Sequence, residues 1–450
     1  MKRLLAIAYF FPPLGGGGCQ RTVKLIRDLE PRGWAATVVT AREADYWILD
    51  PTLAEDVPSS AEVLRVKGLT SLRLLRLFAR GGVSIEQRQG ARDPETFRKL
   101  RRLQSWLLVP DGYRPWAREA ERAAARRIAA GGISALWTTS SPESAHLAGL
   151  ALRRRFGLPW IADFRDPWVG RVTYRPPTNW HHERHKELER RVVETADRIT
   201  VVSEAMAALY RERYPARAER VVVLPNGYDP NDWTRADRLD ASLSSARAQG
   251  TREEGGARRF VLLHAGQLAH RPTARTLLDA LQQVIDRDPA AREEIRLRFL
   301  GGNEELFPEE WESRGLGGIV EMLPSRPHVE ALVAMRHATA LVLLGHGGDA
   351  DALLYTGKIY EYATSGRPVL GIVDPGPGAD LIRSAGIGEV TPARDATAAA
   401  RVLESWIAAW RRGERLETDP PAALRAGWER SRTAGQVAGL FESLLSEPGK

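Results

Sequence analysis

The sequence predicts two α/β domains, each built on a doubly wound parallel sheet, which face each other across a cleft. Two observations support this fold class. The chain has 450 residues, more than one hydrophobic core usually organises. Short apolar runs rich in β-branched residues alternate with helical patterns, in two separate blocks. Open sheets of this class bind ligands at the carboxyl ends of their strands, so two of them suit an enzyme that joins two substrates.

The first block, residues 1–227, predicts an N-terminal domain with six strands and helices between them. The apolar runs lie at residues 4–10, 36–40, 135–139, 160–164, 199–203 and 221–224. Residues 61–130 interrupt this block with two basic amphipathic stretches. We therefore expect a basic helical insertion within the first domain.

The second block, residues 260–425, predicts the C-terminal domain. Its apolar runs lie at residues 260–265, 297–300, 319–323, 341–344, 369–373 and 387–390. Residues 228–259 lose apolar periodicity and carry Asp, Ser, Arg and Gly, which predicts an interdomain linker. Residues 426–450 predict a terminal helix that returns to the N-terminal domain.

The formal net charge of +8 is concentrated in the predicted insertion. Residues 61–130 hold sixteen Lys or Arg against seven Asp or Glu, a local balance of 16 − 7 = +9. Two interpretations stay open: helices that pack on the domain with solvated arginines, or a surface that meets a membrane or an acceptor. Nucleic acid is disfavoured as a partner, because no recognition motif accompanies these basic residues.

Cysteine usage and hydropathy favour a cytoplasmic protein. Cys19 is the single cysteine, so neither an internal disulfide nor a cysteine-based zinc cluster can form. The apolar N-terminal run ends at Pro12 and is far shorter than the ~20 residues of a membrane span. His181, His182 and His185 lack an HExxH pattern, so a bound metal is disfavoured as well.

A glycine-rich loop connects the first predicted strand to the first predicted helix. Gly16, Gly17 and Gly18 in this loop let the backbone approach a ligand closely and aim N–H groups at it. The loop matches neither the G-x-G-x-x-G fingerprint nor the P-loop, which disfavours NAD and ATP. We predict that these glycines contact a ligand; a tight turn without a ligand is the alternative.

Five short motifs follow one another along the two predicted domains. They are Pro-Pro-Leu-Gly-Gly at residues 12–16, Val-Ser-Glu at 202–204, Pro-Asn-Gly at 225–227, Gly-Lys-Ile-Tyr-Glu-Tyr at 357–362 and Gly-Arg-Pro-Val at 366–369. In their order and spacing the chain resembles, over essentially its whole length, the GT-B glycosyltransferases of the GT4 type. The resemblance implies two Rossmann-like domains and the transfer of a sugar from a nucleotide-sugar donor.

The resemblance also implies a donor site in the C-terminal domain. By similarity Glu361 would bind the ribose hydroxyls, and Lys358, three residues earlier, would lie near the phosphates. Gly266 and Arg271 follow the first strand of this domain, and a guanidinium can hold two phosphate oxygens. We expect a UDP- or GDP-linked sugar as donor and no required cofactor.

Two positions depart from the GT4 pattern. Leu353 stands where the family commonly has a second glutamate against the donor sugar, and Gln267 stands where it has an arginine near the phosphates. These departures keep a non-catalytic sugar-nucleotide or membrane-binding GT-B module open as an alternative. A sugar-nucleotide epimerase of the same fold is another.

Charged residues at the end of the strand at 160–164 predict the acceptor side of the reaction. Asp163, Arg165 and Asp166 belong to an Asp-Phe-Arg-Asp-Pro-Trp sequence that resembles a bacterial envelope-polysaccharide subset of the family. A carboxylate there could take the acceptor's proton or orient its hydroxyl. The alternative is structural, with Asp166 capping the turn and Asp163 pairing Arg165. His146, at a helix start after a strand, is a further candidate for contact with the acceptor.

The leading hypothesis is a glycosyltransferase of bacterial cell-envelope polysaccharide biosynthesis. Its donor would be a nucleotide sugar, and its acceptor a hydroxyl of a lipid-linked or polysaccharide substrate. The resemblance implies retention of the anomeric configuration. The basic insertion would place the enzyme peripherally on the anionic inner face of the plasma membrane.

Overall fold

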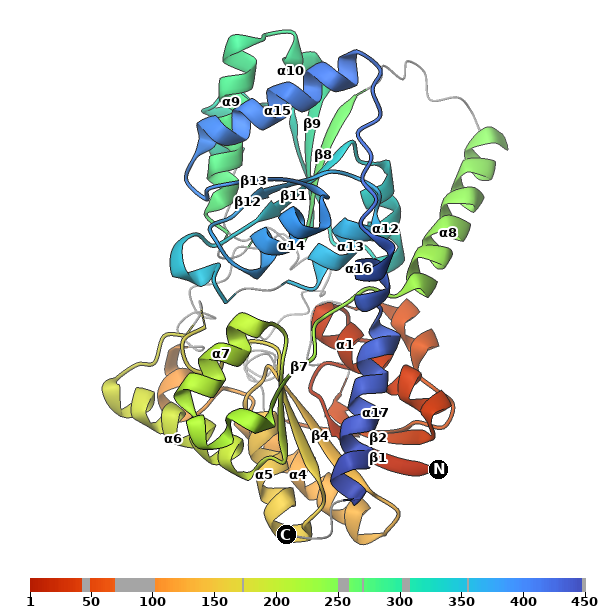
Figure 1. Ribbon diagram of the computed structural model, residues 1–450, viewed down its shortest axis with the longest axis vertical. Coiled ribbons are helices and arrows are strands. Elements are labelled where there is room, and N and C mark those ends of the chain that lie inside the picture. Colours follow the sequence, from red (N-terminus) through yellow and green to blue (C-terminus); the bar gives the residue numbers. More distant parts are fainter. Residues whose placement is uncertain are drawn as a thin grey trace, which may run out of the picture. The chain divides into compact units, whose positions relative to one another are not determined.

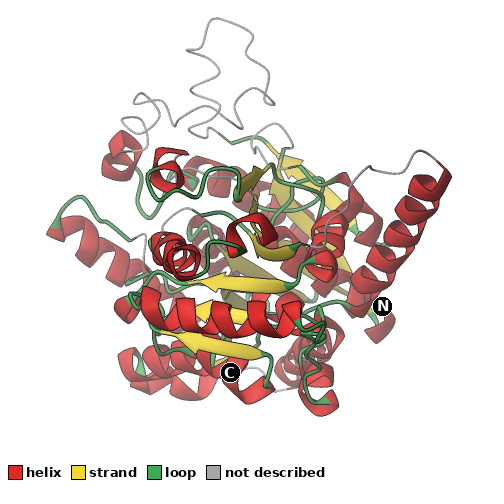
Figure 2. Ribbon diagram, turned by 90° about the horizontal axis from the view of Figure 1, so that it is seen from above, coloured by secondary structure: helices red, strands yellow, loops and turns green. Residues whose placement is uncertain are grey.

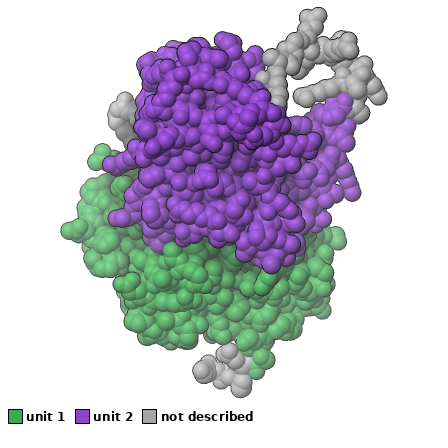
Figure 3. All heavy atoms as spheres, turned by 45° about the horizontal axis from the view of Figure 1, so that its top comes forward, with its two compact units in different colours: residues 1–226, 430–450 green, residues 227–429 purple. Residues whose placement is uncertain are grey.

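The computed structural model describes residues 1–42, 49–68, 102–171, 174–249, 259–268, 271–301, 308–353 and 356–446. Two compact units make up the chain: unit 1 comprises residues 1–226 and 430–450, and unit 2 comprises residues 227–429 (Figure 3). Most of the basic amphipathic sequence, residues 69–101, lies outside the described residues.

Unit 1 is built on a seven-stranded parallel sheet with the order β3-β2-β1-β4-β5-β6-β7 (Figure 1). Its strands are β1 Lys2–Ile7, β2 Trp34–Ala41, β3 Glu62–Val66, β4 Ala135–Ser140, β5 Trp160–Phe164, β6 Arg198–Val201 and β7 Val221–Val223. Leu4 of β1 pairs with Ala36 of β2 on one side and Ala135 of β4 on the other. The order reverses between β1 and β4, which is where open α/β sheets bind ligands.

The helices that accompany this sheet include α1 Gly17–Leu29, α4 Arg114–Ala129, α5 Ser144–Phe156, α6 Asn179–Thr195, α7 Glu204–Arg213 and α17 Arg430–Ser446, and residues 102–107 are helical as well. Short 3-10 turns lie at η1 Glu30–Arg32, η3 Pro51–Asp56 and η5 Pro215–Arg220. The terminal helix α17 joins the core of unit 1, where the ring of Phe441 lies 5.3 Å from that of Trp34. Burial of these two aromatic rings stabilises the packing of α17 on unit 1.

Unit 2 is built on a six-stranded parallel sheet with the order β10-β9-β8-β11-β12-β13. Its strands are β8 Phe260–Ala265, β9 Ile295–Leu300, β10 Val320–Leu323, β11 Ala340–Leu344, β12 Val369–Ile372 and β13 Gly388–Thr391. Successive residues of β8 enter different cores: Phe260 and Leu262 one, Leu263 and Ala265 the other. Burial on both faces explains why its strands read as continuous apolar runs.

Helices complete unit 2 (red in Figure 2). They are α8 Pro230–Gln249, α9 Thr273–Arg287, α10 Ala291–Glu294, α11 Pro308–Glu312, α12 His328–His337, α13 Lys358–Thr364, α14 Pro377–Ala385, α15 Ala396–Arg411, α16 Ala422–Gly427 and the 3-10 turn η6 Gly348–Ala350. Among the described residues, no helix is long and apolar enough to cross a membrane.

The fold class predicted from the sequence is confirmed: two α/β units each carry a parallel sheet. Two local features differ from the expectation. Residues 228–259 were expected as a linker, but α8 occupies much of this segment, and Trp233 and Ala236 bury its inner face in unit 2. The strand β3 lies within the predicted insertion; it is a half-buried edge strand, so it lacks the apolar run of a central strand.

Candidate functional site

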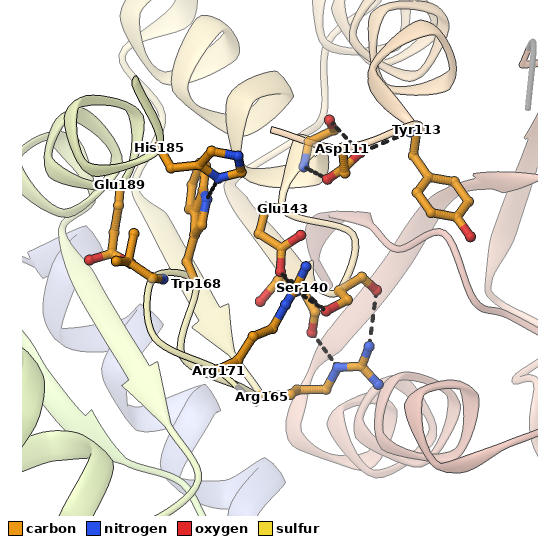
Figure 4. A network of polar contacts seen from close by, with 12 residues as sticks. Asp111, Tyr113, Ser140, Glu143, Arg165, Trp168, Arg171, His185 and Glu189 are labelled. Carbon is orange, nitrogen blue, oxygen red and sulfur yellow. Dashed lines mark hydrogen bonds and ion pairs between the residues drawn. The ribbon is translucent and has the colours of Figure 1, made fainter. Parts of the chain in front are cut away.

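The carboxyl ends of β4 and β5 in unit 1 carry a buried acidic pair (Figure 4). The carboxylate of Asp111 accepts hydrogen bonds from the backbone N–H and hydroxyl of Ser144, at 2.9 and 2.8 Å, and from the N–H of Tyr113 at 2.9 Å. Glu143, at the start of α5, forms an ion pair with Arg171. Burial and the neighbouring Glu143 raise the pKa of Asp111 to about 6.

The raised pKa of Asp111 predicts a pH dependence of stability. The folded pKa lies above the ordinary value of about 3.9, so the unfolded chain ionises more readily. The free energy of unfolding should therefore fall as the pH rises from about 4 to 6, through this group. Asp111→Asn should remove that part of the slope, measured by urea denaturation at several pH values. An unchanged slope would contradict the assignment.

Asp163, a predicted catalytic residue, is completely buried and fully paired. Arg21 of α1 donates to both carboxylate oxygens, at 3.0 and 2.7 Å, and the hydroxyls of Thr139 and Thr200 donate at 2.8 Å each. Burial alone would raise the pKa of Asp163, but Arg21 and these hydrogen bonds hold it below its ordinary value. With its oxygens occupied in this way, Asp163 anchors α1 to the sheet.

Arg165 does not pair with Asp163, the partner that the structural alternative gave it. Asp163 pairs with Arg21, not with Arg165; Arg165 donates to the backbone oxygens of Ser140 and Ser141. Arg165 lies one residue beyond the end of β5, so the two-residue periodicity that would place it beside Asp163 does not extend to it. A Cβ atom added to Gly18 would lie 2.0 Å from Nη1 of Arg165, so the glycine makes room for the guanidinium.

The other residues predicted to contact a ligand or the acceptor at this end of unit 1 differ in solvent exposure. Gly16, Gly17 and Asp166 are exposed, and the carboxylate of Asp166 lies close enough to Arg171 to help raise the pKa of that guanidinium. His146 is completely buried: Nδ1 lies 2.7 Å from the hydroxyl of Thr138, and its ring lies 4.4 Å from that of Phe164. Burial lowers the pKa of His146 to about 4, so the ring is neutral near pH 7. Contact with an acceptor would require this side chain to become exposed.

The three histidines of α6 each have partners of their own. His181 contacts the hydroxyl of Thr178 and the backbone oxygen of Trp106, and Nδ1 of His182 lies 3.0 Å from the hydroxyl of Tyr174. His185 accepts a hydrogen bond from the indole N–H of Trp168 at 3.0 Å. In the parts of the chain that the structure describes, no three His, Cys, Asp or Glu residues gather as metal ligands would.

In unit 2, Lys358 lies against the carboxyl end of β8. Its Nζ donates to the backbone oxygen of Ala265 at 2.6 Å, and a Cβ atom on Gly266 would lie 2.6 Å from the same Nζ. Gly266 also has φ +151°, a conformation that side chains rarely adopt. Burial lowers the pKa of Lys358 to about 8, opposed by the neighbouring Glu361. The amine therefore stays largely protonated at neutral pH.

Gly266→Ala should perturb this end of β8. The methyl group would strain the backbone and displace the amine of Lys358, at a cost of about 1–3 kcal/mol in the free energy of unfolding. Gly317→Ala is the matched control, because a Cβ atom there meets nothing within 4 Å. Urea denaturation of both variants measures the difference. Equal stability of the two variants would mean that Gly266 tolerates a side chain.

Arg271 lies at the carboxyl end of β11, where its guanidinium donates to the backbone oxygen of Leu344. A small pocket adjoins it, lined by Arg271, Leu343, Leu344, Gly345, Asp351, Thr356, Val373, Asp374, Gly378 and Ala379. Asp351 shapes this pocket by accepting from the backbone N–H groups of His346, at 2.7 Å, and Asp374, at 2.9 Å. Sequence reasoning did not single out Asp351. Leu353, two residues on, is half-buried.

Glu361 is buried and takes part in a cluster that the sequence analysis missed. Its carboxylate lies 2.9 Å from Nε2 of His328, at the start of α12. The other ring nitrogen of His328 lies 3.6 Å from the carboxylate of Asp232 in α8. Three elements far apart in the chain thus bring two carboxylates to one imidazole, and no local motif signals such a cluster. Lys358 and Glu361 lie close enough to interact, as their spacing predicts.

Comparisons with known proteins concern both the sequence and the fold. Residues 15–232 match the family described as Glycosyltransferase Family 4. A D-inositol 3-phosphate glycosyltransferase from Nocardiopsis dassonvillei is 23% identical over 231 residues, 50% of this chain and 51% of that protein. One from Geodermatophilus obscurus is 27% identical over 188 residues, 40% of this chain and 39% of that protein. The chain thus spans about half the length of these relatives, or less.

Two solved structures share the fold over the whole chain. The sucrose-phosphate synthase tll1590 of Thermosynechococcus elongatus has a TM-score of 0.65 at 16% identity, with 100% of each chain covered. A UDP-forming α,α-trehalose-phosphate synthase of Burkholderia vietnamiensis has a TM-score of 0.61 at 12% identity, with 99% of this chain and 98% of that chain covered. At these identities the likeness concerns the fold alone.

Proposed function

Residues 15–232 match Glycosyltransferase Family 4 and the chain has the GT-B fold, and from this premise we propose that it is a GT4-type glycosyltransferase that transfers a sugar from a nucleotide-sugar donor to an acceptor hydroxyl. The observation that carries the proposal is the grouping in unit 2 of Lys358, Gly266 and Arg271 at the carboxyl ends of β8 and β11. Open α/β sheets bind ligands at this edge, next to the strand order's reversal.

The donor chemistry fits these side chains. Leaving-group charge on a nucleoside diphosphate rises as the glycosidic bond breaks, so fixed cations at the phosphates stabilise the transition state. Lys358 and Arg271 would supply that charge, and Glu361 would accept hydrogen bonds from the ribose hydroxyls. We propose a UDP- or GDP-linked sugar that needs no bound metal.

The acceptor would bind unit 1 at the carboxyl ends of β4 and β5. Asp166 is the exposed carboxylate of the predicted trio, so we assign it contact with the acceptor hydroxyl. Arg165 and the exposed Gly16 and Gly17 lie near the start of α1 and would contribute polar contacts. The pairing of Asp163 with Arg21 supports a positioning role for Asp163.

The finer part of the proposal concerns the acceptor and the pathway. The Asp-Phe-Arg-Asp-Pro-Trp sequence at residues 163–168 supports a lipid-linked or polysaccharide acceptor in cell-envelope polysaccharide synthesis, with retention of configuration as in similar enzymes. The basic residues of the N-terminal half support a peripheral location on the inner face of the plasma membrane. Leu353 and Gln267 favour the second candidate, a non-catalytic module that binds a sugar nucleotide.

A donor screen with release of nucleoside diphosphate as readout tests the function. UDP- and GDP-sugars are each incubated with the protein, with and without a lipid extract that contains glycolipid acceptors. Release that depends on the extract supports transfer. Release that occurs equally without it would indicate hydrolysis or epimerisation, and binding without release of any nucleotide would favour the module.

A further inference from the structure

One surface of unit 1 exposes four large apolar side chains. Leu103, Trp106 and Leu107 have 54%, 49% and 71% of their surface exposed, and Trp180 of α6 has 65%. The first three lie at positions i, i+3 and i+4 of the helical segment 102–107, so they share one face. Gathered apolar side chains on a surface commonly mark an interaction site, whereas single ones need no explanation.

Contacts through His181 hold the two tryptophans on the same surface. The ring of His181 lies 5.5 Å from the ring of Trp106 and 4.9 Å from that of Trp180. Nε2 of His181 also lies 3.1 Å from the backbone oxygen of Trp106. The histidine itself is only 5% exposed, so it forms a buried support beneath the two indoles. We call Leu103, Trp106, Leu107 and Trp180 the apolar patch.

Arginines surround the apolar patch. Arg102 is exposed next to Leu103, and Arg184 is exposed four residues after Trp180, on the same side of α6. Arg114 lies close to both Arg118 and Arg184; its pKa is lowered mainly by burial and further by these two like charges. Repulsion among these arginines would be relieved by an anionic partner.

Two carboxylates of these helices pair with other basic residues and not with the arginines next to the apolar patch. Glu119 pairs with Arg122, and Glu183 pairs with Lys186, each within one turn of its own helix. Asp111 and Glu121 act on Arg114 with opposite charge. The exposed charges next to the apolar patch are those of Arg102 and Arg184, because Glu183 is paired with Lys186.

We propose that the apolar patch docks this protein on an anionic lipid bilayer. Tryptophans favour the boundary between hydrocarbon and headgroups, and leucines can enter the acyl region. Arginines next to them attract anionic headgroups, each contributing about 1 kcal/mol. This proposal rests on the proposed membrane location of the transferase and names the face that serves it.

The apolar patch is also linked to the predicted acceptor segment. Helix α6 carries Trp180 near its start, and His185, five residues later, accepts the indole hydrogen bond of Trp168. Trp168 closes the Asp-Phe-Arg-Asp-Pro-Trp sequence that also contains Asp166. Docking through α6 would therefore bring lipid-linked hydroxyls near the proposed acceptor residues of unit 1.

Cosedimentation with vesicles tests the proposal. Vesicles of equal parts phosphatidylglycerol and phosphatidylcholine are compared with vesicles of phosphatidylcholine alone. The wild-type protein should bind the anionic vesicles more tightly, and Trp106→Ser/Leu107→Ser should weaken that binding by at least about tenfold. Arg102→Glu/Arg184→Glu should weaken it as well and remove most of its salt dependence. Leu243→Ser, at an exposed leucine of α8, is the control that should bind like wild type.

Several results would overturn the proposal. The apolar patch would be excluded as the docking face if the wild-type protein bound both kinds of vesicle equally. The same conclusion would follow if the Trp106→Ser/Leu107→Ser variant bound like wild type. A wild-type dimer in solution that this variant converts to monomers would instead assign the patch to a second copy of the chain. Urea denaturation of each variant, followed by circular dichroism, reports on folding. Vesicle binding without acceptor-dependent release would retain the docking face while rejecting the transferase, and the reverse result would reject only the docking face.

Discussion

Asp163→Asn is expected to lower the free energy of unfolding of unit 1 by about 3–5 kcal/mol, the usual cost of breaking a buried ion pair by removing one partner. The exposed fractions of the Arg21 and Asp163 side chains are 6% and 0%, so the variant leaves a buried guanidinium without its counter-charge. Arg21 also donates to the backbone oxygen of Leu224, so the loss would extend from α1 to the segment after β7. Urea denaturation followed by tryptophan fluorescence measures the change.

Two further variants test whether the loss of stability comes from the unpaired buried charge of Arg21. Asp166→Asn, at an exposed carboxylate three residues later, should change the free energy of unfolding by less than about 0.5 kcal/mol. The double variant Arg21→Met/Asp163→Leu should recover much of the loss, because neither buried charge then lacks a partner. Stability of Asp163→Asn close to that of the wild type would contradict the anchoring role and restore Asp163 as a candidate for catalysis.

Acid should remove the same stabilisation. The folded pKa of Asp163 is held below its ordinary value, so its contribution is fully present above about pH 3.9 and is lost as the pH falls through the folded pKa. Asp111 acts in the opposite direction at higher pH, because its pKa is raised. Stability should therefore improve between pH 6 and about 4 through Asp111 before it falls in stronger acid through Asp163.

Glu361→Ala and Arg271→Ala should each weaken nucleoside diphosphate binding by about 10- to 100-fold. This range corresponds to the loss of a hydrogen bond to a charged group, about 1.5–3 kcal/mol. Titration calorimetry with UDP and with GDP gives the affinities. Glu389→Ala is the matched control, because Glu389 is an exposed glutamate of β13 in the same unit. Near-normal affinity in both variants would mean that the donor binds elsewhere.

The contact between Glu361 and His328 refines this expectation. Removal of the glutamate also deprives a largely buried imidazole of its 2.9 Å partner, so Glu361→Ala should lower stability as well as affinity. Glu361→Gln retains the shape and an amide oxygen, and it should be more stable than Glu361→Ala. Comparing their affinities at equal folded fraction separates the ribose contact from the structural one.

The fold could be predicted because most of its strands are buried on both faces and read as apolar runs. Strand β3 could not, because an edge strand with half-buried residues carries no such run. Helix α8 has few inward positions, Trp233 and Ala236 among them, so its sequence resembles a linker. Local pattern predicts an element only where the element buries enough of its own residues.

Site residues were harder to predict than elements, since their roles depend on partners far along the chain. Asp163 lies 142 residues from Arg21, and His328 lies 33 residues from Glu361. Charge density after a strand pointed to Asp163 and Arg165 without indicating which of them is paired and buried. The spacing of Lys358 and Glu361 within one helix is local, and their proximity could be read from the sequence.

The most direct test of the central claim is the stoichiometry of the reaction. Nucleoside diphosphate released and sugar incorporated into the acceptor are measured in one mixture, with a radiolabelled donor that the screen has identified. Glycosyl transfer predicts one sugar incorporated for each nucleoside diphosphate released. At a donor concentration below saturation, both products should fall strongly in Glu361→Ala and stay at the wild-type level in Glu389→Ala. Nucleotide release without incorporated sugar, or incorporation unaffected by Glu361→Ala, would contradict the account.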